Sequence, residues 1–351
     1  MLMGLPLIGL TAINADIIDY LEFPPITRYV VHAPFNTSAF AVICALDVMM
    51  LLGIALLLKT SMNRRRVTAV RNAQAFPFWG WWGIIIMLTG WTLAWTRLSW
   101  FQPWQEHTFC IPWVGYILSV NALCLQRSGR SPLTDAPGKF LFMFPASAIF
   151  WWFFEYLNRF VQNWYYVQVG DFSPMEYALL ASMAFATVLP AVLSTHRLLL
   201  TLAIFNPGLS ALRPVSLPHG RMPAAAALLV AAGGLAFIGV YPDFLYPLVW
   251  IAPLLIICSL QALWRRPTLF DDIQSGDWRL MVASAAAALV CGFFWEMWNF
   301  YSLTRWEYAI PLVDRFHIFA MPLLGYGGYL PFGMECLVIG QIVMGRELLA
   351  P

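Results

Sequence analysis

Long apolar runs recur along the whole chain and are separated by short polar segments. A helix that crosses the hydrocarbon core of a bilayer needs about 20 mostly apolar residues. Runs of roughly that length occur in about nine places, which predicts an all-α, polytopic transmembrane helix bundle. The predicted spans are Ser38–Leu58, Phe76–Trp95, Cys110–Leu125, Phe140–Phe160, Glu176–Leu193, Met222–Val240, Phe244–Leu263, Leu280–Phe300 and Met321–Met344.

The composition agrees with a bilayer location. Apolar residues make up 60% of the chain and charged residues only 11%, whereas soluble domains average about 45–50% and about 25%. The 17 Trp and 13 Tyr residues suit the interfacial belts of membrane proteins. A net charge of +2 gives no reason to expect a nucleic-acid partner.

Lys and Arg alternate between the connections. They gather after the first, third, fifth, seventh and ninth predicted spans, and the remaining connections contain fewer. By the positive-inside bias, the C-terminus is expected in the cytoplasm and the N-terminus outside. The basic residues concerned are Lys59, Arg64, Arg65, Arg66, Arg71, Arg127, Arg130, Lys139, Arg197, Arg213, Arg221, Arg265, Arg266, Arg279 and Arg346.

The chain also shows an internal duplication. Glu155 and Asn158 each precede Glu296 and Asn299 by 141 residues, and a Trp-x-Tyr follows each pair. Four spans in each half would give both halves the same orientation, so the expected arrangement is two parallel four-helix repeats plus an N-terminal helix. The predicted divisions are 1–75 for the N-terminal segment, first span and basic loop, 76–200 for the first repeat, 201–221 for a cytoplasmic linker, and 222–351 for the second repeat.

A carboxyl group inside a span is costly, by about 2.5–3.5 kcal/mol on insertion scales, so Glu155 and Glu296 need a partner or a purpose. In each Glu-x-x-Asn the two residues share one helix face, and Asn158 or Asn299 could donate its amide to the acid. One interpretation is an acid–base pair. The other is polar contact between helices that pins the two halves together.

Aromatic residues surround both acids and could line a pocket for a hydrocarbon or stabilise a cation through their ring faces. They could equally form an interfacial belt. The supporting candidates are Trp164, Tyr166, Trp295, Trp298, Trp306 and Tyr308.

Glu335 is a third candidate acid, after a Gly- and Pro-rich stretch that predicts a bent or interrupted helix. The alternative is a carboxyl group that bonds backbone freed at the bend. His317, in the outer connection after the second Glu-x-x-Asn, could bind an anionic headgroup or take part in proton transfer, or could be a plain loop residue. Asp47, within the first span, is expected to pair with a basic or amide group. The six single cysteines are expected to be buried thiols.

Familiar catalytic motifs are missing from the sequence. There is no P-loop, no GxSxG, no HExxH, no His-rich box and no Gly-rich dinucleotide turn. No cofactor and no metal site are therefore expected.

Two resemblances appear at these motifs. Trp295-Glu296-x-x-Asn299, Met321-Pro322-Leu323-Leu324-Gly325-Tyr326 and Pro331-Phe332-x-x-Glu335 resemble an uncharacterised family of bacterial polytopic membrane proteins, which implies a bacterial inner membrane and no particular activity. The layout of acids among aromatics is similar to integral-membrane carotenoid cyclases and hydratases. That resemblance implies that Glu296, Glu335 and Glu155 would protonate a polyene, although the paired acids of that family are reduced here to Glu335 alone.

The leading hypothesis is an integral membrane enzyme that does acid–base chemistry on an isoprenoid or other lipid, with its site toward the outer leaflet. Glu155, Glu296 and Glu335 would carry the chemistry. A proton-coupled transporter or lipid-handling protein, and a non-catalytic subunit or scaffold of a membrane complex, remain alternatives. The expected partner is a membrane lipid or isoprenoid, and a homo-oligomer or larger membrane complex stays open.

Overall fold

The computed structural model describes residues 2–63, 74–218 and 220–350. Arg64, Arg65, Arg66 and Arg71, on which part of the topology prediction rests, lie outside the described residues. The described chain is mostly helical, as expected. Its elements before the midpoint are η1 Leu2–Gly4, α1 Leu5–Ala12, η2 Asp19–Leu21, α2 Thr37–Asn63, α3 Phe78–Trp95, η3 Ser99–His107, α4 Cys110–Ser128, α5 Pro132–Asp135, α6 Pro137–Val161 and β1 Trp164–Val167.

The second part of the chain continues the helical arrangement and adds three short strands. The elements are α7 Pro174–Phe185, α8 Val188–Leu199, α9 Arg221–Ala236, α10 Pro242–Leu245, α11 Leu248–Leu263, α12 Asp271–Gln274, α13 Arg279–Phe300, β2 Arg305–Tyr308, β3 His317–Ile318, β4 Met321–Pro322, η4 Leu323–Gly328, α14 Tyr329–Met344 and α15 Arg346–Leu349.

Five helical segments among the described residues are long and apolar enough to cross a membrane. They are Thr37–Met62, Pro137–Val161, Pro174–Leu199, Arg279–Phe300 and Leu323–Met344, and a sixth is possible if the bent pair Ser99–His107 and Cys110–Ser128, which meet at 72°, forms one span. These helices fit an integral membrane protein.

A helix forms at each of the nine predicted positions, but a count of nine spans is not confirmed. Arg221–Ala236 and Leu248–Leu263 are helices of 16 residues, about 24 Å long at 1.5 Å per residue, while the hydrocarbon core is about 30 Å thick. The predicted windows ran about four residues past these helices, because α9 already ends at Ala236 and α11 begins only after Pro247.

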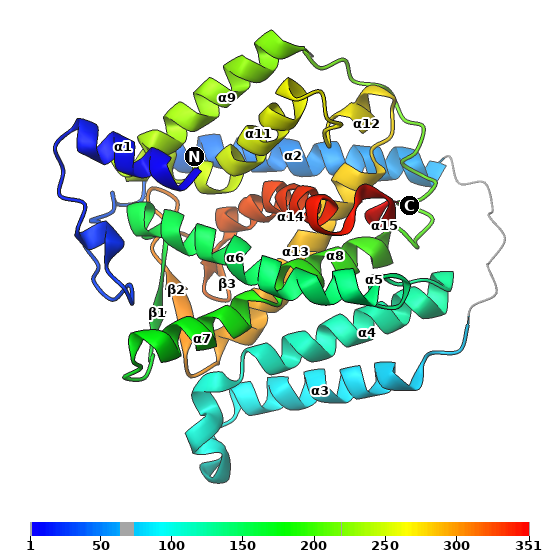
Figure 1. Cartoon of the computed structure of the whole chain (residues 1–351), viewed down its shortest axis with the longest axis horizontal. Helices are drawn as coiled ribbons and strands as arrows, with labels where there is room; N and C mark the ends of the chain where they lie inside the picture. Colours follow the sequence, from blue (N-terminus) through cyan, green and yellow to red (C-terminus); the bar gives the residue numbers. More distant parts are fainter. Residues whose placement is uncertain (1, 64–73, 219, 351) are drawn as a thin grey trace.

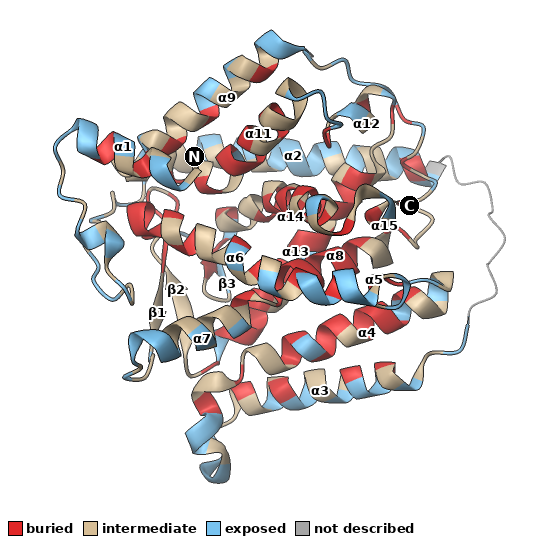
Figure 2. Ribbon diagram, in the orientation of Figure 1, coloured by how far each residue is buried: buried red, intermediate tan, exposed pale blue. Residues whose placement is uncertain are grey.

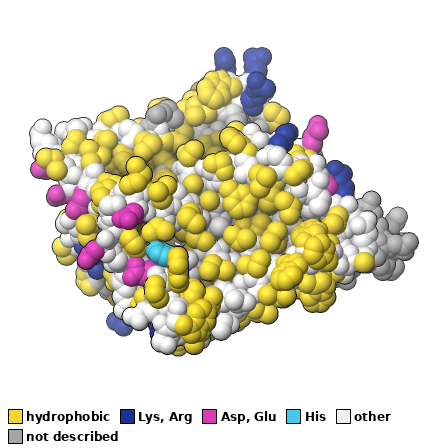
Figure 3. Space-filling view, turned by 60° about the horizontal axis from the view of Figure 1, so that its bottom comes forward, with side chains coloured by type: hydrophobic (Ala, Val, Ile, Leu, Met, Phe, Trp, Pro, Cys, Tyr) yellow, Lys and Arg dark blue, Asp and Glu magenta, His cyan; other side chains and the backbone are white. Residues whose placement is uncertain are grey.

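Buried and peripheral helices are clearly separated (Figure 2). α4, α8 and α13 contain many buried residues, whereas α2 and α3 expose much of their apolar surface. Figure 3 shows a broad face dominated by hydrophobic side chains, with charged groups largely at its edges. An apolar outer surface of this kind is the solvated side in a bilayer.

Matching helix pairs pack together in the two parts of the chain. α3 packs along α4, and α9 packs along α11. α8 contacts α6 and α13, while α14 contacts α13 and α6. The inner helices α6, α8, α13 and α14 thus form the centre of the bundle, and α3–α4 and α9–α11 flank it (Figure 1).

At one end of the bundle, β1 and β2 form a two-stranded antiparallel sheet. Trp164 pairs with Tyr308, and Tyr166 pairs with Trp306. The α6 helix ends where Gln162 adopts a left-handed conformation (φ 46°), which turns the chain back toward β1. The sheet therefore joins the segments that follow the two Glu-x-x-Asn pairs.

Candidate functional site

Glu155 is buried on α6, and its Oε1 accepts three hydrogen bonds. The donors are Trp151 Nε1 at 3.0 Å, Trp164 Nε1 at 3.0 Å and Tyr166 Oη at 2.7 Å. Trp151 lies one turn earlier on the same helix, and the other two donors come from β1. Three donors on one oxygen offset much of the desolvation cost of the carboxyl group.

Glu296, on α13, has a similar but less complete set of donors. Its Oε1 accepts from Tyr308 Oη at 2.6 Å and from Tyr329 Oη at 2.9 Å. Trp306 Nε1 in turn donates to Tyr308 Oη at 2.9 Å. The other carboxyl oxygen, Oε2, is buried and has no hydrogen-bond partner among the described residues.

The two asparagines do not donate to the acids, so that prediction was wrong. Asn158 Nδ2 donates to the Trp164 carbonyl at 2.7 Å, and Asn299 Nδ2 donates to the Trp306 carbonyl at 2.8 Å. Each Asn Oδ1 also accepts the backbone N–H of the same tryptophan, at 3.4 Å and 2.9 Å. The asparagines therefore hold the strands, and the strands carry the tyrosines that reach the acids.

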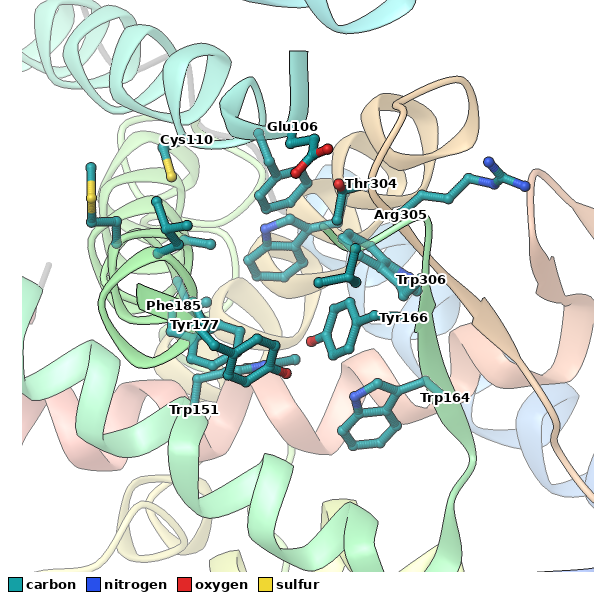
Figure 4. Close-up of a pocket in the computed structure, with 18 of the residues that line it drawn as sticks. Glu106, Cys110, Trp151, Trp164, Tyr166, Tyr177, Phe185, Thr304, Arg305 and Trp306 are labelled. Atoms are coloured by element: carbon teal, nitrogen blue, oxygen red, sulfur yellow. The ribbon is translucent and has the colours of Figure 1, made fainter. Parts of the chain in front are cut away.

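An apolar cavity of about 210 Å³ lies between the two acid networks. Glu155 and Glu296 do not line it themselves, but their aromatic donors do. Figure 4 labels the three donors to Glu155, which are Trp151, Trp164 and Tyr166. The wall is rich in tryptophan and tyrosine, and we call this space the aromatic cavity. Its aromatic residues of these two types are Trp151, Trp164, Trp250, Trp295, Trp306, Tyr166, Tyr177, Tyr308 and Tyr329.

The tyrosine hydroxyls at the wall remain proton donors. Burial, followed by the neighbouring Glu155 carboxyl group, holds the pKa of Tyr166 well above its ordinary range. Burial and Glu296 do the same to the pKa of Tyr308. Both hydroxyl groups therefore keep their protons and can pass them only as part of a relay.

The aromatic cavity reaches the surface beside α7. Met183 belongs to its lining and is 60% exposed, and it lies within the candidate span Pro174–Leu199. Polar residues at another part of the lining are Glu106, His107, Thr304 and Arg305. A hydrocarbon in the bilayer could thus approach from the side, while a polar end could remain at the edge.

A second cavity, of about 270 Å³, adjoins the first and is more polar. Glu155 lines it directly. The lining also includes residues 24–28 of the N-terminal segment and, at the end of α6, Asn158, Arg159 and Gln162. We call this space the polar cavity. Five residues border both cavities: Trp164, Tyr166, Val169, Phe172 and Tyr177.

Glu335 lies apart from the other two acids. It is buried on α14, after the 3-10 turn of η4, and lines neither of these two cavities. Its Oε2 has no hydrogen-bond partner among the described residues. A shared site with Glu155 and Glu296 is therefore not what the geometry favours.

Some of the other predicted residues line the aromatic cavity, and others lie away from it. Trp295 lines the aromatic cavity, whereas Trp298 is buried against Trp113 on α4, with ring centroids 4.8 Å apart. His317 is exposed, belongs to the short strand β3 and pairs with Asp314 at 2.8 Å, and it lines neither of the two cavities described above. Its role as a headgroup ligand or proton carrier stays a prediction.

Two smaller predictions need correction. Asp47 forms no ion pair with a described residue and instead lies against Gly327 of η4, where a Cβ atom would come within 2.3 Å of its Oδ1. Of the six cysteines, Cys44 and Cys110 are only partly buried, and the other four are buried as expected.

Several residues of the site had no local signal in the sequence. Trp250 stands in a continuous apolar run, and Tyr177 follows an ordinary helix start; only tertiary packing brings them to the cavity. Tyr329, a donor to Glu296, follows Gly327 and Gly328. A tyrosine beside paired glycines, six residues before the candidate acid Glu335, was the one available hint.

Comparisons with known proteins leave the two resemblances as expectations. No family model matches this chain, and neither a curated protein nor a solved structure matches it.

Proposed function

We propose that this chain is a membrane enzyme that carries out acid–base chemistry on an isoprenoid or other lipid. One observation carries the proposal: two buried carboxyl groups each bind a tyrosine hydroxyl, and both tyrosines line one aromatic cavity. A wall of tryptophan and tyrosine faces suits both a hydrocarbon and a developing carbocation. The exposed edge at Met183 supports access from the lipid side.

The proposed chemistry passes protons through the tyrosines. With a proton on Glu155, its O–H donates to Tyr166 Oη, and the Tyr166 proton points into the cavity. Transfer of the tyrosine proton to a substrate double bond forms a C–H bond, while the Glu155 proton moves to Tyr166 Oη. The resulting cation then loses a different proton to Tyr308, whose own proton moves to the Glu296 carboxylate. The net reaction is an isomerisation or cyclisation that uses no redox cofactor.

Proton-coupled transport is the second candidate. The observation that favours it is the contact of Glu155 with a polar cavity on one side and, through Tyr166, with an apolar cavity on the other. Intramembrane acids in transporters lie on such routes. A transporter would move its lipid without altering it, so the chemical identity of the lipid separates the two candidates.

We also propose the wider arrangement that the sequence predicted. The paired packing of α3–α4 with α9–α11, and the matching Asn-to-strand contacts, support two parallel repeats. The distribution of Lys and Arg supports a cytoplasmic C-terminus. The resemblance to a family of bacterial polytopic membrane proteins is the basis for proposing a bacterial inner membrane. The two cavities would then lie toward the outer leaflet.

Lipid extraction and mass spectrometry test the enzyme proposal. Cells would carry the wild type, Glu155→Gln, Glu296→Gln or the matched control Glu347→Gln, because Glu347 is exposed on α15. We expect one lipid or isoprenoid species to disappear, and its isomeric precursor to accumulate, in the first two variants only. Identical lipid profiles at equal protein levels would refute the enzyme proposal.

A further inference from the structure

The two acids differ in their contact with the cavities, although they occupy matching positions in the sequence. Glu155 lines the polar cavity directly, whereas Glu296 is fully buried and lines neither of the two cavities. Residues that form the polar cavity include the exposed Ile26 and Asp171. The polar cavity therefore opens to the surface on one side and reaches Glu155 on the other.

We propose that the polar cavity is a water-filled proton channel that serves Glu155 alone, and that Glu296 exchanges protons only through the aromatic cavity. The two acids would then have different roles: in each turnover Glu155 takes up one proton from water, and Glu296 releases one proton through Tyr308 into the aromatic cavity when the product leaves, so that no proton accumulates. The access of water to Glu155 does not depend on the proposed function. The division of catalytic roles between the two acids does rest on the proposed function.

The groups around Glu155 support a route that ends at this residue. Toward the aromatic cavity, its Oε1 is covered by Trp151, Trp164 and Tyr166, and Tyr177 of α7 lies behind them. Toward the polar cavity, Arg159 lies one turn further along α6. Its Nε is buried and has no hydrogen-bond partner among the described residues. A water molecule in the polar cavity could satisfy such a donor.

The proton step at Glu155 is a simple exchange. A hydronium ion in the polar cavity gives one proton to the carboxylate, which forms one O–H bond at the acid and leaves a water molecule. The Tyr166 hydrogen bond carries that proton onward. The polar cavity gives Glu296 no such supply, because Tyr308 and Tyr329 cover its Oε1 and Glu296 does not line that cavity.

Carbodiimide labelling of the wild-type protein tests this difference without any activity assay. The water-soluble, cationic reagent EDC, used with glycinamide as the trapping amine, is compared with the apolar reagent DCCD, and peptides are analysed by mass spectrometry. We expect the water-soluble EDC, and not only the apolar DCCD, to label Glu155, and we expect EDC to leave Glu296 and Glu335, which line neither cavity, unlabelled. Equal EDC labelling of Glu155 and Glu296, or none at Glu155, would overturn the proposal.

A plug at the mouth of the polar cavity provides the second test. Ile26→Cys places a thiol at the exposed lining, and a membrane-impermeant methanethiosulfonate attached there should abolish EDC labelling of Glu155. Ile18→Cys is the matched control, because Ile18 is 72% exposed and lies outside both cavity linings. Unchanged labelling after a complete Ile26→Cys modification would contradict the proposed route.

The two proposals can fail separately. If EDC reaches Glu155 but no lipid changes in Glu155→Gln cells, the water route stands and the enzyme proposal fails. If lipids change but EDC does not label Glu155, the enzyme proposal stands and the route fails.

Discussion

The buried acids Glu155 and Glu296 take their hydrogen bonds from aromatic side chains. No ion pair joins either acid to a described basic residue. Aromatic donors tie the position of each carboxyl group to the shape of the cavity, because the same rings form its wall. A loss of one hydroxyl group should therefore affect both stability and lipid chemistry.

Tyr308→Phe keeps the ring and removes the hydroxyl group that donates to Glu296. We expect a loss of about 1–3 kcal/mol in the free energy of unfolding, because a buried acceptor loses a partner, together with reduced lipid turnover. Thermal unfolding in detergent and lipid mass spectrometry would measure the two effects. Tyr241→Phe is the control, since Tyr241 is 56% exposed; an equal effect of the two substitutions would contradict the assigned contact.

Asn299→Leu removes both hydrogen bonds that hold Trp306 in place. We expect a destabilisation of about 1–3 kcal/mol, because the backbone groups of Trp306 lose partners. Asn158→Leu should act similarly on Trp164. The thermal stability of both variants would be compared with that of the control Gln102→Leu, because Gln102 is exposed. A neutral result would mean that the strands are held without the asparagines.

At the scale of elements, small residues set the distance between α3 and α4. A Cβ atom at Gly115 would come within 2.3 Å of the Met87 backbone nitrogen and 2.6 Å of the Gly83 oxygen. Small residues allow this close approach of helices in membranes. The pair therefore packs backbone to backbone along this contact.

Gly115→Ala should destabilise the protein by about 1–3 kcal/mol, the usual cost of overpacking. Gly53→Ala is the matched control, because a Cβ atom at that position in α2 meets nothing within 4 Å. The melting temperature of each purified variant would show the difference. Equal melting temperatures would show that α3 can shift away from α4 without cost.

The sequence predicted the positions of the helices well but not their lengths or their status as spans. Apolar runs locate a helix because burial in lipid and burial in protein require the same residue types. The same fact hides whether a helix such as α11, with 16 residues, crosses the bilayer. Pro247 marked the start of α11, but the predicted span Phe244–Leu263 included it and began four residues too early.

The candidate site was predictable as a set of acids and aromatics, but not as a geometry. Glu155, Tyr166, Glu296 and Tyr308 could be found from the duplicated motif alone. The hydrogen-bond partners of Asn158 could not be predicted, because an amide three residues from an acid can bond either to that acid or to nearby backbone. Here Asn158 bonds to the backbone of Trp164. Trp250 and Tyr177 came from tertiary packing, which no local pattern encodes.

At the scale of the molecule, the N-terminal segment is attached to the end of α6. Glu22 accepts hydrogen bonds from Thr27 and pairs with Arg159 at 3.3 Å. The Thr27 hydrogen bonds, helped by Arg159, lower the pKa of Glu22 below 4.5. Because the folded pKa is the lower one, this stabilisation is present above the unfolded value and is lost as pH falls through the folded pKa.

Glu22→Gln should therefore cost less than about 1 kcal/mol at neutral pH, as for other partly exposed pairs. The difference from wild type should vanish when the pH falls below the folded pKa of Glu22. Unfolding free energies measured across that range would show it. A difference that persists unchanged in acid would exclude the charge of Glu22 as its source.

Reporter fusions test the orientation of the whole chain. Green fluorescent protein fused after Pro351 should fluoresce, and alkaline phosphatase at the same point should be inactive, if the C-terminus is cytoplasmic. An impermeant thiol reagent should reach Ile26→Cys from outside intact cells. The reverse pattern would place the polar cavity on the cytoplasmic side.

The β1–β2 sheet also limits how the molecule can move. It links the segments after α6 and α13 by backbone hydrogen bonds, and each strand is in turn anchored to its own helix by an asparagine. A displacement of the end of α6 is therefore transmitted through the sheet to the end of α13, and the reverse is also true. Movement of the two halves relative to each other would have to break the hydrogen bonds of the β1–β2 sheet. A movement of α7, which lies outside the sheet, would leave those hydrogen bonds intact.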